Sequence, residues 1–274
     1  MTRDRRLWPC NGRVALDSLR GQVDADMFVP GTPAMVEVAE VPLWRTPEGG
    51  VDKVLLHGES VTVIEDAPIA FVRSDWDGYV GYVPEIALAR AVQATHRITA
   101  PASHIYTAPD IKSPPRMALS LGAELAVTAT TGRFAETRDG FVPTRHITPV
   151  DRSVPAPETL RALIGTPYLW GGNSYLGIDC SGLVQLAFRL AGIACPRDSD
   201  QQEAAFPATQ SDPRAGDLIF WRGHVGIMLT DTDLIHANAY HMAVAVEPLS
   251  QARARIAAGE FGQVTSIRRI PGFF

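Results

Sequence analysis

Residues 165–202 read GTPYLWGGNSYLGIDCSGLVQLAFRLAGIACPRDSDQQ, with Cys180 between a glycine-rich loop and a long apolar segment. The apolar segment, residues 183–191, is hydrophobic on nearly all sides, which is typical of a helix buried against a sheet. Gly192 is a natural helix stop, and Asp179 is a suitable N-cap. The sequence therefore predicts a helix that carries Cys180 in its first turn.

A thiol in the first turn of a helix is a candidate nucleophile. Unpaired backbone N–H groups and the helix dipole favour an anion there, and thiolate is the reactive form of cysteine. A buried structural cysteine is the commoner alternative, because reactivity also requires a base and an oxyanion site. Cys180 is therefore a nucleophile only if the rest of the chain supplies these partners.

The chain after this helix reads as antiparallel strands. Apolar runs separated by short polar turns occupy residues 218–221, 224–229 and 234–239. The connection at residues 229–234 is rich in Asp and Thr, as expected of a hairpin loop, and side chains alternate between two faces along each strand. The register of this hairpin therefore decides whether its two histidines meet.

The hairpin register predicts how two histidines and the thiol cooperate. A three-residue loop, in which Leu229 pairs with Asp233, places His224 and His236 on the same face of the sheet. A slip of one residue separates them. In the first register His224 can accept the proton of Cys180, while His236 orients the other ring nitrogen of His224. A lone strand histidine is more often structural, so the prediction rests on the three residues together.

The sequence around these residues resembles the NlpC/P60 family of papain-like cysteine peptidases. The resemblance covers residues from about 156 to 274. Six motifs in order are specific, whereas any one of them alone is weak. They are PYLWGG at 167–172, DCSG at 179–182, RDS at 197–199 followed by Gln202, GDL at 216–218, GHVG at 223–226 and IHA at 235–237.

The resemblance implies an α+β, papain-like catalytic domain with a cysteine nucleophile. It implies Cys180 as nucleophile, His224 as base and His236 as the third polar residue. It also implies that the Tyr168 hydroxyl and the Cys180 backbone N–H hold the oxyanion, which suits a phenol and an amide as hydrogen-bond donors. Packing of the Tyr168 ring is the alternative role.

Further residues are implied to line the substrate cleft. They are Trp170, Asp179, Ser181 and Ser199. Packing is the alternative role of Trp170. Ser199 has its own alternative, because it can cap a short helix at residues 200–205.

Residues 29–149 have a different pattern, with short β-rich runs separated by Gly, Pro and Asp, as in small barrels. Two sets of runs align as a repeat. Each set resembles a bacterial SH3 domain. The aligned segments are 44–47 with 106–109, 57–59 with 121–124, and 77–80 with 139–142.

The chain is therefore predicted to contain two small SH3-like β-barrels before the catalytic domain. We expect an N-terminal extension at residues 1–29, SH3-like domains at 30–92 and 93–150, and an NlpC/P60 cysteine peptidase domain at 151–274. Within the extension, helical spacing of apolar residues predicts a short helix at residues 14–23.

Proteins with this domain order resemble γ-D-glutamyl-L-diamino acid endopeptidases, which cut murein (peptidoglycan) peptides after γ-D-glutamate. The resemblance implies a substrate with a free N-terminal L-Ala, in cell-wall recycling. It implies Tyr79 of the first barrel as the amine contact, with the acidic partner left open among Glu40, Glu48 and Glu59. The alternative is that Tyr79 covers its own barrel.

Two other functions stay open. The chain can be a broader amidase or acyltransferase of the same superfamily, since Cys, His and His serve any acyl transfer. It can also be a non-catalytic peptidoglycan-binding protein. The complete set of catalytic motifs disfavours this last function, and the preferred diamino acid and the oligomeric state stay undetermined.

Composition restricts the partners and the compartment. The net charge of −5 argues against nucleic acid or an anionic membrane surface, and no apolar run reaches the ~18 residues of a membrane span. The three cysteines form no CxxC pair, so we expect no disulfide framework, no metal and no cofactor. Residues 1–6 are basic, but no apolar signal segment follows, so a cytoplasmic location is expected.

Overall fold

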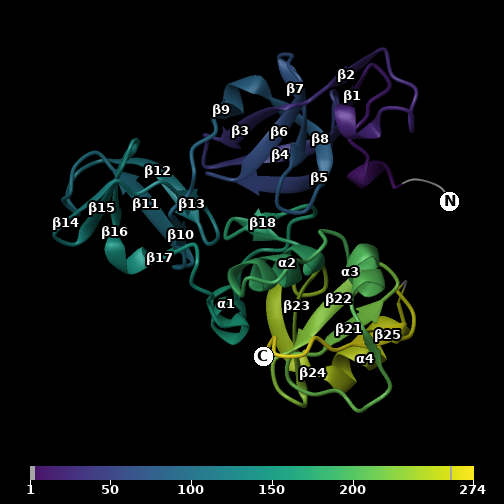
Figure 1. The fold of residues 1–274 in the computed structure, drawn as a ribbon. Coiled ribbons are helices and arrows are strands. Elements are labelled where there is room, and N and C mark those ends of the chain that lie inside the picture. Colours follow the sequence, from purple (N-terminus) through teal and green to yellow (C-terminus); the bar gives the residue numbers. More distant parts are fainter. Residues whose placement is uncertain (1–3, 260) are drawn as a thin grey trace. The chain divides into compact units, whose positions relative to one another are not determined.

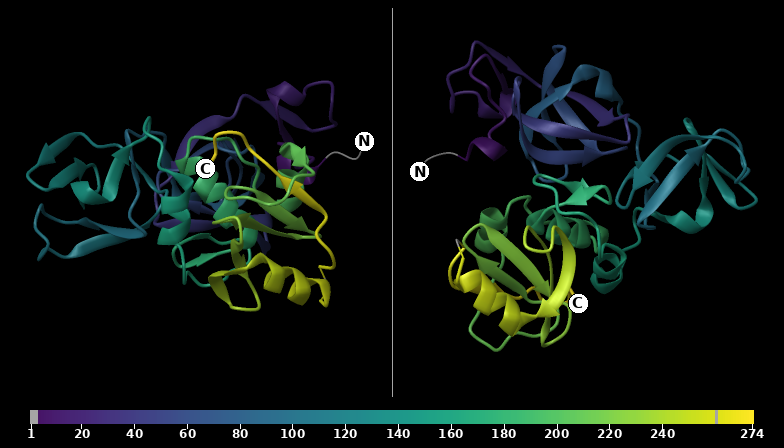
Figure 2. Two further views of the ribbon diagram at one scale, coloured as in Figure 1. Left: turned by 90° about the horizontal axis from the view of Figure 1, so that it is seen from below. Right: turned by 180° about the vertical axis from the view of Figure 1, so that it is seen from behind.

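The chain folds into two compact units in the computed structural model, which describes residues 4–259 and 261–274. The first unit ends at Val150, and the second runs from Asp151 to Phe274. The first, in purple to teal, consists mostly of strands, whereas strands and helices are mixed in the second (Figures 1 and 2). The finer division of the first unit into an extension and two domains stays a prediction.

The N-terminal extension is strand-like where a helix was predicted. Strand β1, Val14–Leu16, pairs in parallel with β2, Met27–Val29, and the 3-10 helix η2, Asp17–Leu19, lies between them. The predicted helix at residues 14–23 is therefore wrong. A strand forms instead of a helix because Val14 and Leu16, two residues apart, both join an apolar cluster on the seven-stranded sheet described below. The cluster also contains Ile64, Phe71, Val80 and Tyr82.

Seven strands of the first unit form one sheet, in the order β5-β4-β8-β7-β6-β3-β9. Their bounds are β3 Thr32–Val36, β4 Glu40–Thr46, β5 Gly49–Leu56, β6 Ser60–Glu65, β7 Ile69–Ser74, β8 Val80–Pro84 and β9 Leu88–Arg90, with 3-10 helices η1 at Arg5–Leu7 and η3 at Glu85–Ala87. A second buried cluster packs against this sheet, separate from the cluster of Val14 and Leu16, and the Tyr79 side chain belongs to it together with Leu43, Val61, Val72 and Val83. A small sheet with a core of its own fits the barrel predicted here.

The next set of strands repeats the same pairing. Strand β10 pairs with β13 and β17 as β3 pairs with β6 and β9, and β11 pairs with β12 and β16 as β4 pairs with β5 and β8. Two short strands, β13 and β14, stand where the first set has the single strand β6, so the set divides into a three-stranded and a five-stranded sheet. The bounds are β10 His96–Ile98, β11 Ala102–Tyr106, β12 Pro115–Ser120, β13 Glu124–Leu125, β14 Ala129–Thr131, β15 Phe134–Thr137, β16 Gly140–Pro143, η4 Thr144–His146 and β17 Ile147–Pro149.

The two sets of strands share a hydrophobic cluster within the first unit. Val54 and Leu56 of β5 pack with residues of the second set, namely Ile98, Ile105, Leu119, Ala123, Leu125 and Val142. The Glu124 amide donates to the His57 carbonyl at 2.9 Å. Gly58 has φ +77°, and a Cβ there would lie 2.1 Å from the Glu124 carbonyl oxygen. This close approach explains why the two sets form one compact unit.

The second unit is built on a six-stranded sheet, in the order β20-β25-β21-β22-β23-β24. Its strands are β20 Ala208–Thr209, β21 Leu218–Trp221, β22 His224–Met228, β23 Asp233–Asn238, β24 Ala243–Pro248 and β25 Ser266–Arg268, and a separate hairpin joins β18 Asn173–Ser174 to β19 Gly177–Ile178. The successive strands predicted between residues 218 and 239 are therefore confirmed.

Four α-helices accompany this sheet in the described part of the second unit: α1 Ala156–Ala162, α2 Cys180–Leu190, α3 Ser199–Ala205 and α4 Leu249–Ala257. Helix α2 packs on β22 and β23, as predicted for the helix that carries the thiol. Helix α4 contributes Leu249, Ala252 and Ile256 to a cluster with Met228 and Leu234 of the sheet. None of the described helices combines the length and apolarity that a membrane crossing requires.

Candidate active site

The start of α2 follows the sequence prediction. Asp179 is the N-cap, and its carboxylate accepts from the Gly182 amide at 2.7 Å and from the Gly171 amide at 2.9 Å. Gly182 is needed at this point, because a Cβ would lie 2.5 Å from the carbonyl oxygen of Gly172. Cys180 is consequently the first helical residue, and its thiol is buried.

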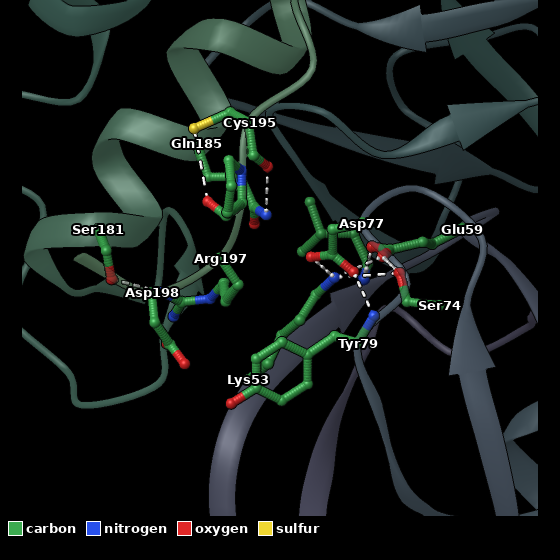
Figure 3. A network of polar contacts seen from close by, with 12 residues as sticks. Lys53, Glu59, Ser74, Asp77, Tyr79, Ser181, Gln185, Cys195, Arg197 and Asp198 are labelled. Carbon is green, nitrogen blue, oxygen red and sulfur yellow. Dashed lines mark hydrogen bonds and ion pairs between the residues drawn. The ribbon is translucent and has the colours of Figure 1, made fainter. Parts of the chain in front are cut away.

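A buried arginine holds the N-cap in place. The Arg197 side chain is 0% exposed and binds both oxygens of Asp179, at 2.9 and 2.8 Å. The same guanidinium donates to the Ser181 hydroxyl at 2.8 Å and to the Gly172 carbonyl at 3.2 Å. Figure 3 shows Arg197 and Ser181 from close by. Asp179 and Ser181 therefore belong to a buried network that fixes the N-terminus of α2, and their contact with substrate stays a prediction.

The hairpin register that brings the two histidines together is confirmed. Ile227 pairs with Ile235, and the Leu229 amide donates to the Asp233 carbonyl at 2.8 Å, which is the three-residue loop expected from the sequence. His224 and His236 accordingly share a face, and His224 Nε2 lies 2.9 Å from His236 Nδ1. Both rings are buried.

Sequence reasoning missed the residue behind this pair, Glu247. Its Oε1 lies 2.8 Å from His236 Nε2, and its carboxylate also forms an ion pair with Arg255. Glu247 pairs with Leu234 across β23 and β24, so its side chain is on the His236 face. The turn that sets this register contains Met242 at φ 51°, a conformation in which Gly or Asn is usual, so the chain carries no ordinary hairpin signal there.

Cys180 and His224 line one pocket of about 220 Å³ in the second unit. Tyr168 and Trp170 line the same pocket, and Trp170 is 69% exposed, so packing is not its role. The Tyr168 amide donates to the Met242 carbonyl at 2.9 Å, which fixes the backbone of the tyrosine. The other lining residues are Gly223, Asn238, Ala239, Tyr240, Arg255, Ile256, Gly259 and Phe261.

Burial keeps the Tyr168 phenol protonated. Desolvation raises the pKa of Tyr168, and the neighbouring Cys180 and Asp179 raise it further. A phenol that retains its proton can donate a hydrogen bond to a developing oxyanion. The role implied for Tyr168 is therefore chemically available at neutral pH.

Ser199 is not the cap of its helix. Asp198 is the N-cap of α3 and forms a capping box with Gln201, whereas Ser199 is the first helical residue. The alternative of a capping role for Ser199 is therefore wrong, because the carboxylate one residue earlier takes that position. Its contact with substrate stays a prediction.

Among the three acids considered as partners of Tyr79, Glu59 shares one buried ammonium with a second carboxylate. Its carboxylate lies 3.1 Å from the buried Lys53 ammonium and accepts from the Ser74 hydroxyl at 3.0 Å (Figure 3). The Asp77 carboxylate binds the same ammonium at 2.8 Å. One ammonium between two carboxylates leaves one negative charge in excess, so Glu40, Glu48 and Glu59 all stay open as the acidic partner.

The charge of the thiol differs from the sequence expectation, in which the helix N-terminus favours a thiolate. Burial raises the pKa of Cys180 to about 12, and the Asp179 carboxylate adds to this shift. Burial also lowers the pKa of His224 to about 3, with His236 and Arg255 acting in the same direction. Desolvation thus outweighs the helix N-terminus, and the pocket holds a neutral thiol and a neutral imidazole at rest.

Native protein is therefore expected to show no thiolate absorbance from Cys180 between roughly pH 5 and pH 9. A thiol with a pKa near 12 keeps its proton below pH 12, and an imidazole with a pKa near 3 takes up no second proton above pH 3. The measurement is the ultraviolet difference between native protein and Cys180→Ala across this range. A signal of one thiolate per chain near neutral pH would contradict the neutral pair.

One group of described residues has the ligand types and spacing of a metal site. The ligand atoms of His236, His241 and Glu247 lie within 4.8 Å of one another. However, the Glu247 carboxylate already binds Arg255, and the guanidinium would repel a metal cation bound to the same carboxylate. We therefore interpret this group as part of the hydrogen-bonded network behind His224.

Comparison with family models agrees with this geometry. The NlpC/P60 family model matches residues 165–256, which contain Tyr168, Cys180, His224 and His236. This segment belongs to the NlpC/P60 family. A second model, described as bacterial dipeptidyl-peptidase SH3 domain, matches residues 43–88. The chain thus carries an NlpC/P60 domain preceded by such an SH3 domain, while the second SH3-like barrel and the papain-like detail stay predictions.

Curated relatives of the NlpC/P60 domain are named as peptidases. Dipeptidyl-peptidase 6 of Lysinibacillus sphaericus is 41% identical over 97 residues, which are 34% of this chain and 35% of the relative. The chain thus matches only about a third of that relative's length. A γ-D-glutamyl-L-lysine dipeptidyl-peptidase of Bacillus cereus is 26% identical over 251 residues, which cover 76% of this chain and 73% of the relative.

A solved structure shares the fold of most of the chain. It is the crystal structure of an NlpC/P60 family protein from Bacillus cereus, with a TM-score of 0.71 and 21% identity, covering 87% of this chain and 99% of that one. At this identity the likeness concerns the fold alone.

Proposed function

We propose that this chain is a cysteine peptidase that hydrolyses peptidoglycan peptides. The observation that carries the proposal is one pocket that contains Cys180 at a helix N-terminus and His224, with His236 hydrogen-bonded behind His224. A nucleophile, a base and an orienting residue are the components of acyl transfer. The names of the relatives, which include endopeptidases and a γ-D-glutamyl-L-lysine dipeptidyl-peptidase, support this substrate class.

The reaction proceeds by acyl transfer through the thiol. The Cys180 sulfur attacks the scissile carbonyl carbon while its proton passes to the His224 nitrogen that does not face His236. The Tyr168 hydroxyl and the Cys180 backbone N–H hold the oxyanion. His224 then returns the proton to the leaving amine, the C–N bond breaks, and a thioester remains. Water, deprotonated by His224, hydrolyses the thioester and restores the thiol.

The bond that we propose lies between γ-D-glutamate and an L-diamino acid, in peptides with a free N-terminal L-Ala. Similarity to the Bacillus cereus dipeptidyl-peptidase over 76% of this chain supports this substrate. A peptide with a free amine is a fragment released from the wall, so the proposed role is cytoplasmic cell-wall recycling. Tyr79 is the proposed amine contact.

Native protein is expected to cleave L-Ala-γ-D-Glu-diaminopimelate about 30- to 1000-fold better, in kcat/KM, than the same peptide with an acetylated N-terminus. An acetyl group forced into an ammonium site costs about 2–4 kcal/mol, because the partners of the ammonium lose their hydrogen bonds. The measurement is the rate of release of diaminopimelate from each peptide. Equal cleavage of both would favour the broader amidase.

Tyr79→Phe is the sharper variant for this test, because the Tyr79 ring belongs to the core of its sheet and Tyr79→Ala would leave a cavity there. We expect Tyr79→Phe to reduce the discrimination between the two peptides. Tyr82→Phe is the matched control, since Tyr82 lies in a different cluster of the same unit. If the two variants discriminate alike, Tyr79 is not the amine contact.

A further inference from the structure

A continuous line of hydrogen-bonding side chains leads away from the proposed base. His224 Nε2 lies 2.9 Å from His236 Nδ1, and His236 Nε2 lies 2.8 Å from Glu247 Oε1. The His236 side chain is 0% exposed and that of Glu247 is 10% exposed. His224 Nε2, His236 Nδ1 and His236 Nε2 therefore each have one partner in this line. The group at the end of the line, Glu247, determines the order of the protons along it.

An ionised carboxylate only accepts hydrogen bonds, so Glu247 requires a proton on His236 Nε2. A neutral imidazole carries one proton, which leaves His236 Nδ1 as an acceptor. His224 must then donate from Nε2. The remaining nitrogen, His224 Nδ1, consequently has a free lone pair, which is what a base for the thiol needs.

We propose that Glu247 is a positioning residue that sets this proton order and so keeps His224 Nδ1 basic. The kinetic consequence rests on the proposed function, whereas the proton order itself does not. Without the carboxylate, His236 can adopt either tautomer. In the opposite tautomer His236 donates to His224 Nε2, and His224 then carries its proton on Nδ1, where it cannot accept one from Cys180.

The charged and titratable groups that face this line are consistent with the assignment. They are Arg255, which binds the Glu247 carboxylate, and His241, whose ring packs edge-on against His236. The hydrogen bond from His236 and the positive charge of Arg255 lower the pKa of Glu247 and keep it ionised. Burial lowers the pKa of His236, so the imidazole is neutral.

The first experiment uses native protein and does not depend on activity. Nitrogen NMR of the histidine rings reports which nitrogen of each neutral imidazole carries the proton. We expect the Nε2–H tautomer for both His236 and His224. The Nδ1–H tautomer at either residue overturns the proposal.

The second experiment removes the charge and preserves the shape. Glu247→Gln is expected to lower kcat about 10- to 100-fold while KM changes less than roughly threefold, because the loss concerns the base and not substrate binding. The matched control is Glu203→Gln, another carboxylate of the second unit, which accepts from Thr265 at 2.7 Å and Ser266 at 2.6 Å. Equal losses in the two variants, or an unchanged kcat in Glu247→Gln, would overturn the proposal.

Two further measurements distinguish a loss of the proton order from misfolding of the variant and from failure of the proposed peptidase function. Glu247→Asp, which keeps the charge, should recover part of the loss. Alkylation of Cys180 by iodoacetamide needs the base but no peptide, so it should slow about 10-fold in Glu247→Gln. If native protein cleaves no peptide but shows the expected tautomers and this slowing, the proposed function fails and the role of Glu247 stands. An unchanged alkylation rate overturns that role.

Discussion

Cys180→Ala is expected to abolish cleavage of L-Ala-γ-D-Glu-diaminopimelate, with a fall in kcat/KM of at least about 10⁴-fold. The thiol is the atom that forms the acyl intermediate, and no other cysteine lines the pocket in the described part of the chain. The substitution removes one buried sulfur from the start of α2, where Asp179 still supplies the cap. The measurement is product release by native and variant protein at equal concentration.

Cys195→Ala is the matched control for this loss. Cys195 is also buried in the second unit, and its sulfur lies 3.4 Å from the Pro196 carbonyl, outside the residues that line the pocket. It should keep the activity of native protein. Retained activity in Cys180→Ala would remove Cys180 as nucleophile. Peptide binding without cleavage by native protein would instead favour the non-catalytic peptidoglycan-binding function.

Local signals allowed the positions of the thiol and the histidines to be predicted. The cap, the first turn and the end of α2 depend on neighbouring residues, so Asp179 and Gly192 were sufficient to place Cys180. A hairpin with a three-residue loop has one register, and parity along two strands then brings His224 to His236. These arguments need no information about distant parts of the chain.

The charges and the supporting residues depend on long-range packing, and the sequence did not predict them. Glu247 meets His236 only through the register of β24, which follows a turn without Gly. The neutral state of Cys180 and His224 is a consequence of burial, and burial is a property of the folded unit. The N-terminal extension shows the same limit, because the neighbouring sheet decides whether Val14 and Leu16 lie on a strand or a helix.

Arg197→Met is expected to destabilise the second unit by about 3–5 kcal/mol, because it leaves the Asp179 carboxylate buried without its cation. The measurement is urea unfolding of the unit that carries each substitution, with hydrogen exchange of the α2 amides as a local readout for Arg197→Met. Arg13→Met is the control, because this arginine also binds a carboxylate through two hydrogen bonds but lies in solvent. Arg13 donates to Glu65 at 3.0 and 2.8 Å, and its side chain is 61% exposed. An exposed pair of this kind should change stability little. Equal effects of the two variants would contradict a special role for the buried pair.

The double variant Asp179→Asn with Arg197→Met tests whether the cost arises from the unpaired charge or from lost packing. Asparagine is a good N-cap without a charge, so it can keep the hydrogen bond to the Gly182 amide. If the stranded carboxylate is the cause, the double variant should be more stable than Arg197→Met alone, with a coupling of about 1–3 kcal/mol. If the guanidinium acts by filling space, the two effects should simply add. The first result would assign to Arg197 the charge compensation that allows a buried acid to cap the helix of the proposed nucleophile.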